Sequence, residues 1–184
     1  WYGDILVALA LCGAVVFFAR RISPRWLLVL GGLAFAAGSV VTLALTWSMV
    51  QGPPAELAAW RLEWTPRYAN VGREILQYRG GWAKQMTHRV PAAQEIQTWY
   101  FVTRLFWHMS GLMLIGIALF KLGVLSAARS RAFYLRIGAL GFGAGTLLMS
   151  LGLWRSFATG WDVLDFVLVS QQLHYWGSLF GALA

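Results

Sequence analysis

The chain has 184 residues, of which 59% are hydrophobic and only 12% are charged. Soluble domains carry about twice that share of charged residues, so this composition argues against a soluble fold and predicts an integral membrane protein. The net charge of +8 comes from 15 basic and 7 acidic residues in an apolar chain. Such a balance predicts cytoplasmic loops and contacts with membrane lipids, and it argues against nucleic-acid binding.

Residues 1–50 are predicted to form two transmembrane helices. The first apolar run extends from about Gly3 to Ala19, which is close to the shortest length that crosses a bilayer. An arginine-rich turn follows, in which Pro24 stops one helix and starts the next. The second apolar run covers residues 26–50 and completes the pair.

The helix predicted over residues 26–50 carries two notable sets of side chains, one small and one with hydroxyl groups. Small residues let helices approach closely in lipid, and the run contains Gly31, Gly32, Ala34 and Gly38. Hydroxyl groups at Ser39, Thr42 and Thr46 share one helical face. We expect them to bond back to carbonyls of their own helix, and the alternative is a stripe that lines a polar cavity.

Residues 51–98 are predicted to be an extracytoplasmic insert of short helices, the middle one amphipathic. The expected helices, separated by a break at Thr65-Pro66, a glycine pair and Pro91, are residues 55–64, 67–78 and 82–89. From Ala92 the helical pattern leads directly into the third apolar run.

Residues 99–184 are predicted to hold two further transmembrane helices and the start of a fifth. The third is expected from about residue 97 to 122 and the fourth from 133 to 154, where Gly141 and Gly145 indicate a helix contact. The fifth is expected to begin near Phe166, with Asp162 and Asp165 at its N-terminus. The chain is expected to be an internal piece of a longer membrane protein.

The short connections at residues 19–26 and 121–136 are rich in basic residues and contain no acidic ones. Such loops favour the cytoplasm, so both are expected on that side, with the insert facing outwards. The two basic connections lie on the same side of the membrane if the apolar runs that begin at Trp26 and Gln97 each cross the membrane once. The predicted fold is therefore all-α: a polytopic membrane helical bundle with an extracytoplasmic helical insert.

Four ionisable residues lie in or beside the apolar runs: Asp4, Arg104, His108 and His174. Ionisable groups are costly in lipid and by default face a bundle interior or a water-filled cavity. A polar cavity that opens beneath the insert is therefore expected. The alternatives are a helix cap or salt bridge for Asp4, headgroup contact for Arg104, and a structural hydrogen-bonded role for His108.

The most polar stretch of the chain runs from Arg73 to Arg89. Candidate contacts with an anionic substrate are Arg79, Gly80, Gly81, Lys84 and Arg89. Glu74 is a candidate base or a partner that orients Arg79, and glycines allow backbone N–H groups to approach a ligand. The alternative is an interfacial helix whose charges face solvent. The three histidines show no metal-ligand spacing, so no metal site is expected.

Motifs in the first run, the insert and the later runs occur in a characteristic order. They are Gly3-Asp4-Ile5-Leu6, the Arg-Arg-x-Ser-Pro-Arg of residues 20–25, Glu74 followed by Tyr78-Arg79-Gly80-Gly81-Trp82 and Gln85, and residues 111–116 and 129–134. Together they resemble the YeiB-like family of bacterial inner-membrane proteins over essentially the whole chain. In the last run this chain has His174 where that family would have a nearby asparagine, and several further helices would precede it.

The YeiB-like family is similar in fold to transmembrane acyltransferases, such as the lysosomal heparan-glucosaminide acetyltransferase. The resemblance implies a protein of the bacterial inner membrane that moves an acyl group from acyl-coenzyme A to an anionic glycan or lipid outside, with no bound cofactor. The intramembrane histidine of those enzymes would lie N-terminal to this chain. Here His108 or His174 would transfer the proton.

Two other functions remain open at this point. A transporter or lipid-handling protein would place Arg104 and Asp4 on its substrate path. A non-catalytic subunit of a membrane complex, or of a homo-oligomer, would use the insert as a docking surface. The inner halves of the apolar runs carry almost no polar residues, which favours a site open to one side only.

Overall fold

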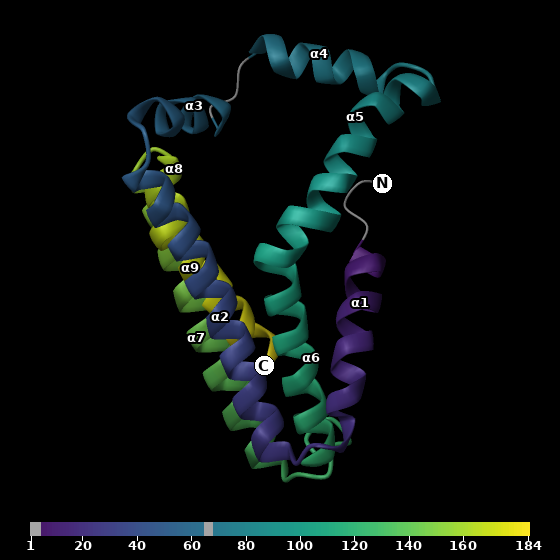
Figure 1. Ribbon diagram of the computed structural model, residues 1–184. Helices are drawn as coiled ribbons and strands as arrows, with labels where there is room; N and C mark the ends of the chain where they lie inside the picture. The colour runs from purple at the N-terminus through teal and green to yellow at the C-terminus, as the bar shows by residue number, and fades with distance from the viewer. Residues whose placement is uncertain (1–4, 65–67) are drawn as a thin grey trace.

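The computed structural model describes residues 5–64 and 68–184, so Asp4 and the break at Thr65-Pro66 lie outside the described residues. The described residues form helices and connecting turns, without a strand. Figure 1 shows two arms that meet at one end and diverge at the other, with α3 and α4 lying across the open end. The all-α prediction is confirmed over the described part of the chain.

The helices follow each other in a simple order. The first half contains α1 (Ile5–Phe17), the 3-10 turn η1 (Phe18–Arg21), α2 (Pro24–Gln51), α3 (Pro54–Trp64) and α4 (Tyr68–Tyr78). The second half contains α5 (Trp82–Glu95), the π-helix η2 (Ile96–Leu105), α6 (Phe106–Lys121), α7 (Arg131–Ala158), α8 (Val163–Asp165), the π-helix η3 (Phe166–Ser170) and α9 (Gln171–Ala182).

Three helices among the described residues are long and apolar enough to cross a membrane: Pro24–Gln51, Trp82–Lys121 and Arg131–Ala158. They correspond to the second, third and fourth predicted transmembrane helices. The first predicted transmembrane helix, over about residues 3–19, corresponds to α1 and η1, which together cover residues 5–21. α1 itself has 13 residues, fewer than the roughly 20 that a crossing helix needs. The fifth helix, from α8 to α9, begins close to the predicted position.

The prediction that the helix after the glycine pair ends before Pro91 was wrong. A single helix of 40 residues runs from Trp82 to Lys121, and Pro91 lies inside it. Proline lacks a backbone N–H, so it removes one hydrogen bond, and the remaining bonds of this long helix keep it continuous. The helix changes from α to π at Ile96, five residues after the proline.

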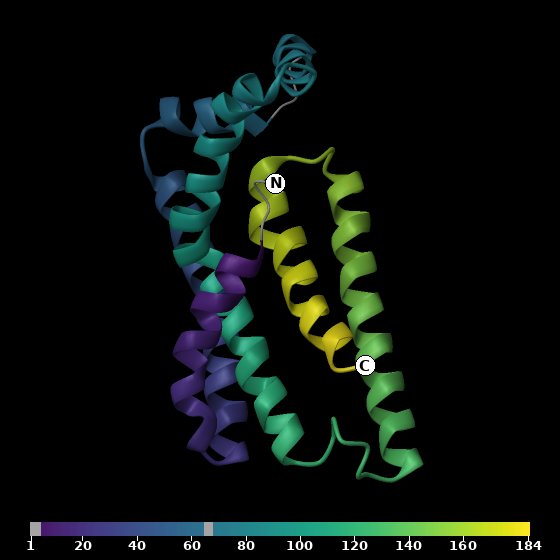
Figure 2. The ribbon, with the colours of Figure 1, turned by 90° about the vertical axis from the view of Figure 1, so that its right-hand side faces the viewer.

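Glycines lie where two pairs of helices pack closely, as the sequence predicted. A Cβ atom on Gly31 of α2 would lie 2.9 Å from the carbonyl oxygen of Gly111 on α6. A Cβ atom on Gly145 of α7 would lie 2.9 Å from the backbone nitrogen of Gly181 on α9. The chain therefore builds two tightly packed pairs, α2 with α6 and α7 with α9, and Figure 2 shows α7 and α9 running side by side.

The two basic connections lie at the same end of the molecule, where the arms meet (Figure 1). Lys121 at the end of α6 donates hydrogen bonds from Nζ to the carbonyl oxygens of Arg20 and Ile22, at 2.6 and 2.7 Å. The insert and the start of α8 lie at the opposite end. This arrangement agrees with the predicted number of crossings between the basic connections.

The start of the last helix is fixed by two aspartates, as predicted. Asp162 accepts hydrogen bonds from the backbone nitrogens of Leu164 and Asp165, and so caps the helix. Asp165 binds the guanidinium of Arg155 on α7 with both carboxylate oxygens, at 2.6 to 3.1 Å. The hydrogen bond from Arg155 holds the pKa of Asp165 below its usual value.

Asp165→Asn should remove a pH-dependent part of the stability. A carboxyl group with a lowered folded-state pKa stabilises the fold above its unfolded pKa of about 4 and loses that effect as the pH falls through the folded value. Wild type should therefore lose melting temperature below about pH 4, and the variant should lose less over the same interval. Thermal unfolding in detergent at pH 7 and pH 3 measures this, with the exposed Glu63→Gln as control. An identical acid-induced decrease in both proteins would contradict the prediction.

Candidate functional site

Aromatic side chains from three distant segments meet near the middle of the long helices. The rings of Phe35 on α2 and Tyr175 on α9 lie 4.2 Å apart, and the ring of His108 on α6 lies 4.9 Å from the first and 5.0 Å from the second. Phe35 is completely buried. We call Phe35, Ser39, His108, Gln172, Tyr175 and Trp176 the three-helix cluster.

Hydrogen bonds fix the orientation of the cluster between α2 and α9. Tyr175 donates its hydroxyl to the carbonyl oxygen of Phe35 at 2.9 Å, in a buried position. Ser39 donates to Oε1 of Gln172 at 2.5 Å and accepts a longer bond from Nε1 of Trp176 at 3.4 Å. A buried network whose members find partners holds its side chains in one arrangement.

The cluster corrects part of the prediction for the hydroxyl stripe. Thr42 and Thr46 bond back to carbonyls of their own helix, those of Gly38 and Thr42, as expected. Ser39 does not, because Gln172 of α9 lies within reach and offers a stronger acceptor geometry across the helix interface. The sequence indicated that the three hydroxyl groups share one helix face, but it did not indicate that Gln172 is the partner of Ser39.

His108 lies at the centre of the cluster. Arg104 precedes it by four residues on the same long helix, so the two side chains share one face of that helix. The central guanidinium carbon of Arg104 lies 5.8 Å from the centre of the Tyr100 ring. His108 is half-buried and packs against the rings of Phe35 and Tyr175, so packing holds its imidazole in place.

His174 does not join His108, although both were predicted to line one cavity. A Cβ atom on Gly152 of α7 would lie 3.1 Å from Nε2 of His174, so this imidazole faces α7. Tyr175, its neighbour in sequence, faces α2 instead. Adjacent residues of a helix point about 100° apart, so one helix cannot direct both side chains to the same place.

Both π-helices end next to the cluster. η2 ends at Leu105, three residues before His108, and η3 ends at Ser170, two residues before Gln172. π-helical turns are rare and occur frequently at functional sites. Two of them on separate helices, both adjacent to the same six residues, mark this part of the fold as a candidate functional site.

The insert holds a second, smaller group of polar side chains at the α4–α5 turn. Nε2 of His88 lies 3.4 Å from Glu74, and the guanidinium of Arg89 lies 5.5 Å from the centre of the Tyr78 ring. Gln85 donates to the carbonyl oxygens of Tyr78 and Gly80, at 3.1 and 3.2 Å. These contacts fold α4 back against α5.

Each predicted insert residue has a definite place in this turn. Glu74 lies beside His88, and its two candidate roles, a base or a partner that orients Arg79, stay predictions. A Cβ atom on Gly80 would lie 2.9 Å from the side chain of Lys84, so glycine is needed for the turn itself. Gly81 begins α5, with open space around its Cα atom. Arg79 and Lys84 are exposed, and Arg89 is half-buried.

The insert group and the three-helix cluster are separate. His88 and His108 lie on one continuous helix, twenty residues apart, which corresponds to about 30 Å. Figure 1 shows the α4–α5 turn at the far end of its arm. The two groups are therefore distinct parts of the structure, and the polar cavity expected beneath the insert stays a prediction.

The sequence analysis missed most of the cluster. It singled out His108 and Ser39, but not Phe35, Tyr175 or Trp176, because aromatic residues in an apolar run carry no positional signal. The pair of glutamines at 171 and 172 was the one available hint, since two amides in an apolar helix need partners. Within the described part of the chain, Oε1 of Gln171 is buried without a hydrogen-bond partner.

Comparison of the chain with protein-family models, with curated proteins and with solved structures gave no match.

Proposed function

We propose that the chain is part of a polytopic protein of the bacterial inner membrane. Its three long apolar helices support this, as do large apolar side chains exposed all round the helices, among them Leu140 and Phe142. In water such a surface would aggregate, whereas in lipid it is the solvated face. With the basic connections in the cytoplasm, residues 51–98 are extracytoplasmic.

Within that class, we propose acyl transfer from acyl-coenzyme A to an acceptor outside the membrane. The observation that carries this is the position of His108, which packs against the rings of Phe35 and Tyr175 in the centre of an apolar bundle, one helical turn after Arg104. A histidine held in this way serves as a base that takes the proton from an attacking hydroxyl or amine. The resemblance to YeiB-like proteins supports the same reaction class.

The insert group supplies the acceptor site in this proposal. Arg79, Lys84 and Arg89 give it a positive face that suits an anionic glycan or an anionic lipid headgroup. An acceptor that reaches both the insert and His108 must extend over about 30 Å. That requirement favours a glycan chain or a lipid-linked glycan over a small molecule.

The alternative of a transporter finds less support. A transported polar substrate needs polar groups on both sides of the bundle centre. The half of the bundle nearer the basic connections contains an apolar core of Val16, Leu27, Leu114 and Ala118. A site that opens to the insert side only suits an enzyme with an external acceptor.

The test is a labelling experiment with the full-length protein in sealed membrane vesicles. Radiolabelled acyl-coenzyme A is supplied on the side of the basic connections, and labelled product is measured on the insert side. Vesicles with the protein should form product, and vesicles without it should not. Arg79→Ala should raise the KM for the acceptor and leave kcat nearly unchanged, because Arg79 is far from His108. Absence of label with every donor chain length tried would reject acyl transfer.

A further inference from the structure

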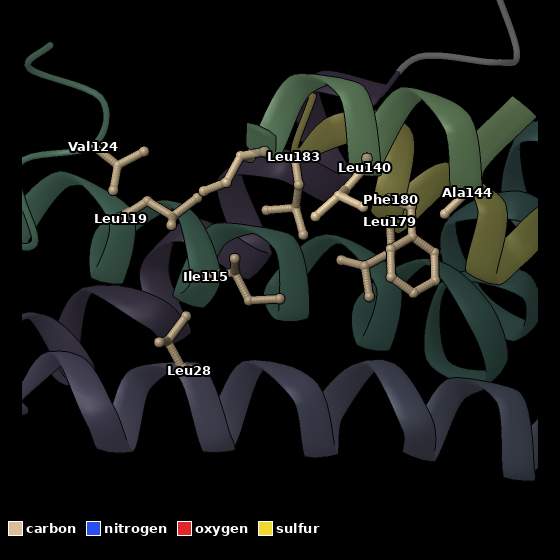
Figure 3. A pocket seen from close by; sticks show the side chains of 11 residues that line it. Leu28, Ile115, Leu119, Val124, Leu140, Ala144, Leu179, Phe180 and Leu183 are labelled. Carbon is tan, nitrogen blue, oxygen red and sulfur yellow. The ribbon is translucent and has the colours of Figure 1, made fainter. Parts of the chain in front are cut away.

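An apolar cavity of about 460 Å³ lies between the α2–α6 pair and the α7–α9 pair. Figure 3 shows Leu28, Ile115, Leu140 and Phe180 turned towards this space from all four helices. Every residue that lines it is aliphatic, aromatic or glycine, and none belongs to the three-helix cluster. Because no lining side chain offers a hydrogen bond, the cavity suits hydrocarbon and not water or a polar substrate.

Two arginines stand one helical turn from the cavity, on opposite walls. Arg25 precedes Leu28 by three residues on α2, and Arg136 precedes Leu140 by four on α7, so each lies on the same helix face as its leucine. Both belong to the first two turns of their helices, at the end of the molecule with the basic connections.

Both guanidiniums are available to a ligand. Arg25 and Arg136 are exposed, and neither has a hydrogen bond or ion pair with any residue that the structure describes. Two other cations at this end are engaged, since Lys121 donates to the carbonyl oxygens of Arg20 and Ile22 and Arg129 donates to that of Leu122. An apolar cavity with two free cations at one end matches an amphiphile with a hydrocarbon tail and an anionic head.

We propose that this cavity binds one acyl chain of an anionic phospholipid, whose phosphate lies against Arg25 and Arg136. The distance between charge and cavity favours a phospholipid over acyl-coenzyme A. One helical turn is about 5.4 Å, so the phosphate must lie close to the start of the chain. In a phospholipid only the glycerol unit separates them, whereas in acyl-coenzyme A a long pantetheine arm does. This site is distinct from the three-helix cluster, and the inference does not depend on acyl transfer.

Native mass spectrometry of the full-length protein tests the proposal. The protein is delipidated, and phosphatidylglycerol or phosphatidylcholine with identical chains is added. Wild type should retain one phosphatidylglycerol, with about a tenfold preference over phosphatidylcholine, because the quaternary ammonium of phosphatidylcholine is repelled by the two arginines and offsets the charge of its phosphate. Ala144→Trp fills the cavity and should abolish retention of both lipids. Leu147→Trp, an exposed position outside the cavity on the same helix, should retain them as wild type does.

The contribution of the two arginines is tested in separate variants. These variants also test the proposal if Ala144→Trp does not fold. Arg25→Gln with Arg136→Gln should remove the preference for phosphatidylglycerol but keep some binding of both lipids. Arg20→Gln with Arg21→Gln removes the same charge from the same end and should leave the preference intact. Equal retention of the two lipids by wild type, or an unchanged adduct in folded Ala144→Trp, would overturn the proposal. Displacement of the lipid by acyl-coenzyme A, mole for mole, would overturn it too.

Discussion

His108→Gln should lower kcat for acyl transfer by about 10²- to 10⁴-fold, the contribution expected of a positioned general base. Glutamine is close to histidine in size and keeps a polar side chain beside Phe35 and Tyr175, but it cannot take a proton from an acceptor at neutral pH. The rings of the cluster should therefore stay packed while the rate falls. The measurement is the initial rate of labelled product with saturating donor and acceptor.

Three controls separate the loss of a base from the loss of the fold. The melting temperature of His108→Gln should stay within a few degrees of wild type. Met109→Ala, at the next position of α6, should keep the wild-type rate. His108→Ala should regain part of its activity with added imidazole, which restores a base to the space left by the side chain. A His108→Gln protein with the wild-type rate would remove His108 from the mechanism.

Gly38→Leu should cause the largest loss of stability of any single change considered. A Cβ atom at this position of α2 would lie 2.5 Å from the hydroxyl of Tyr175 and 2.9 Å from Cβ of Trp107. Leucine must therefore move α6 or α9 and break the hydrogen bond from Tyr175 to Phe35. Overpacking costs about 1–3 kcal/mol and a broken buried hydrogen bond about 1–3 kcal/mol, so the total is about 2–6 kcal/mol.

Gly32→Leu is the matched control on the same helix. No atom lies within 4 Å of a Cβ placed there, so leucine should be accommodated without strain. Both changes replace glycine inside α2 by a residue that favours helix, so the propensity gain is equal and cancels in the comparison. Unfolding in detergent with increasing denaturant gives both free energies. Equal stabilities would show that α6 and α9 do not meet at Gly38.

The sequence was sufficient for elements whose signals are local. Proline and glycine punctuation placed α3 and the break at Gly80-Gly81, and apolar length placed α2 and α7. The helix end predicted before Pro91 was wrong. A proline usually marks the end of a helix, but here the other hydrogen bonds of the long helix outweigh the one that the proline removes. The π-helical turns of η2 and η3 could not be predicted, since they depend on the packing of the finished bundle.

The three-helix cluster was beyond sequence reasoning for a different reason. Its contacts join residues far apart in the chain, such as Ser39 with Gln172 and Phe35 with Tyr175. Which faces of α2, α6 and α9 meet depends on crossing angles that apolar periodicity does not determine. In the insert the same limit applies, because Glu74 could pair with any of several cations and the fold of the turn selected His88.

The continuous helix from Trp82 to Lys121 joins the insert to the cluster without an intervening loop. α5 has 14 residues and is about 21 Å long, and η2 connects it to α6. If α5 tilted by about 10° at η2, its tip would move by about 4 Å. Such a tilt would also change the position of Arg104, which belongs to η2 and lies one turn before His108. A displacement of the glycine turn would then reach the bundle centre through the helix itself.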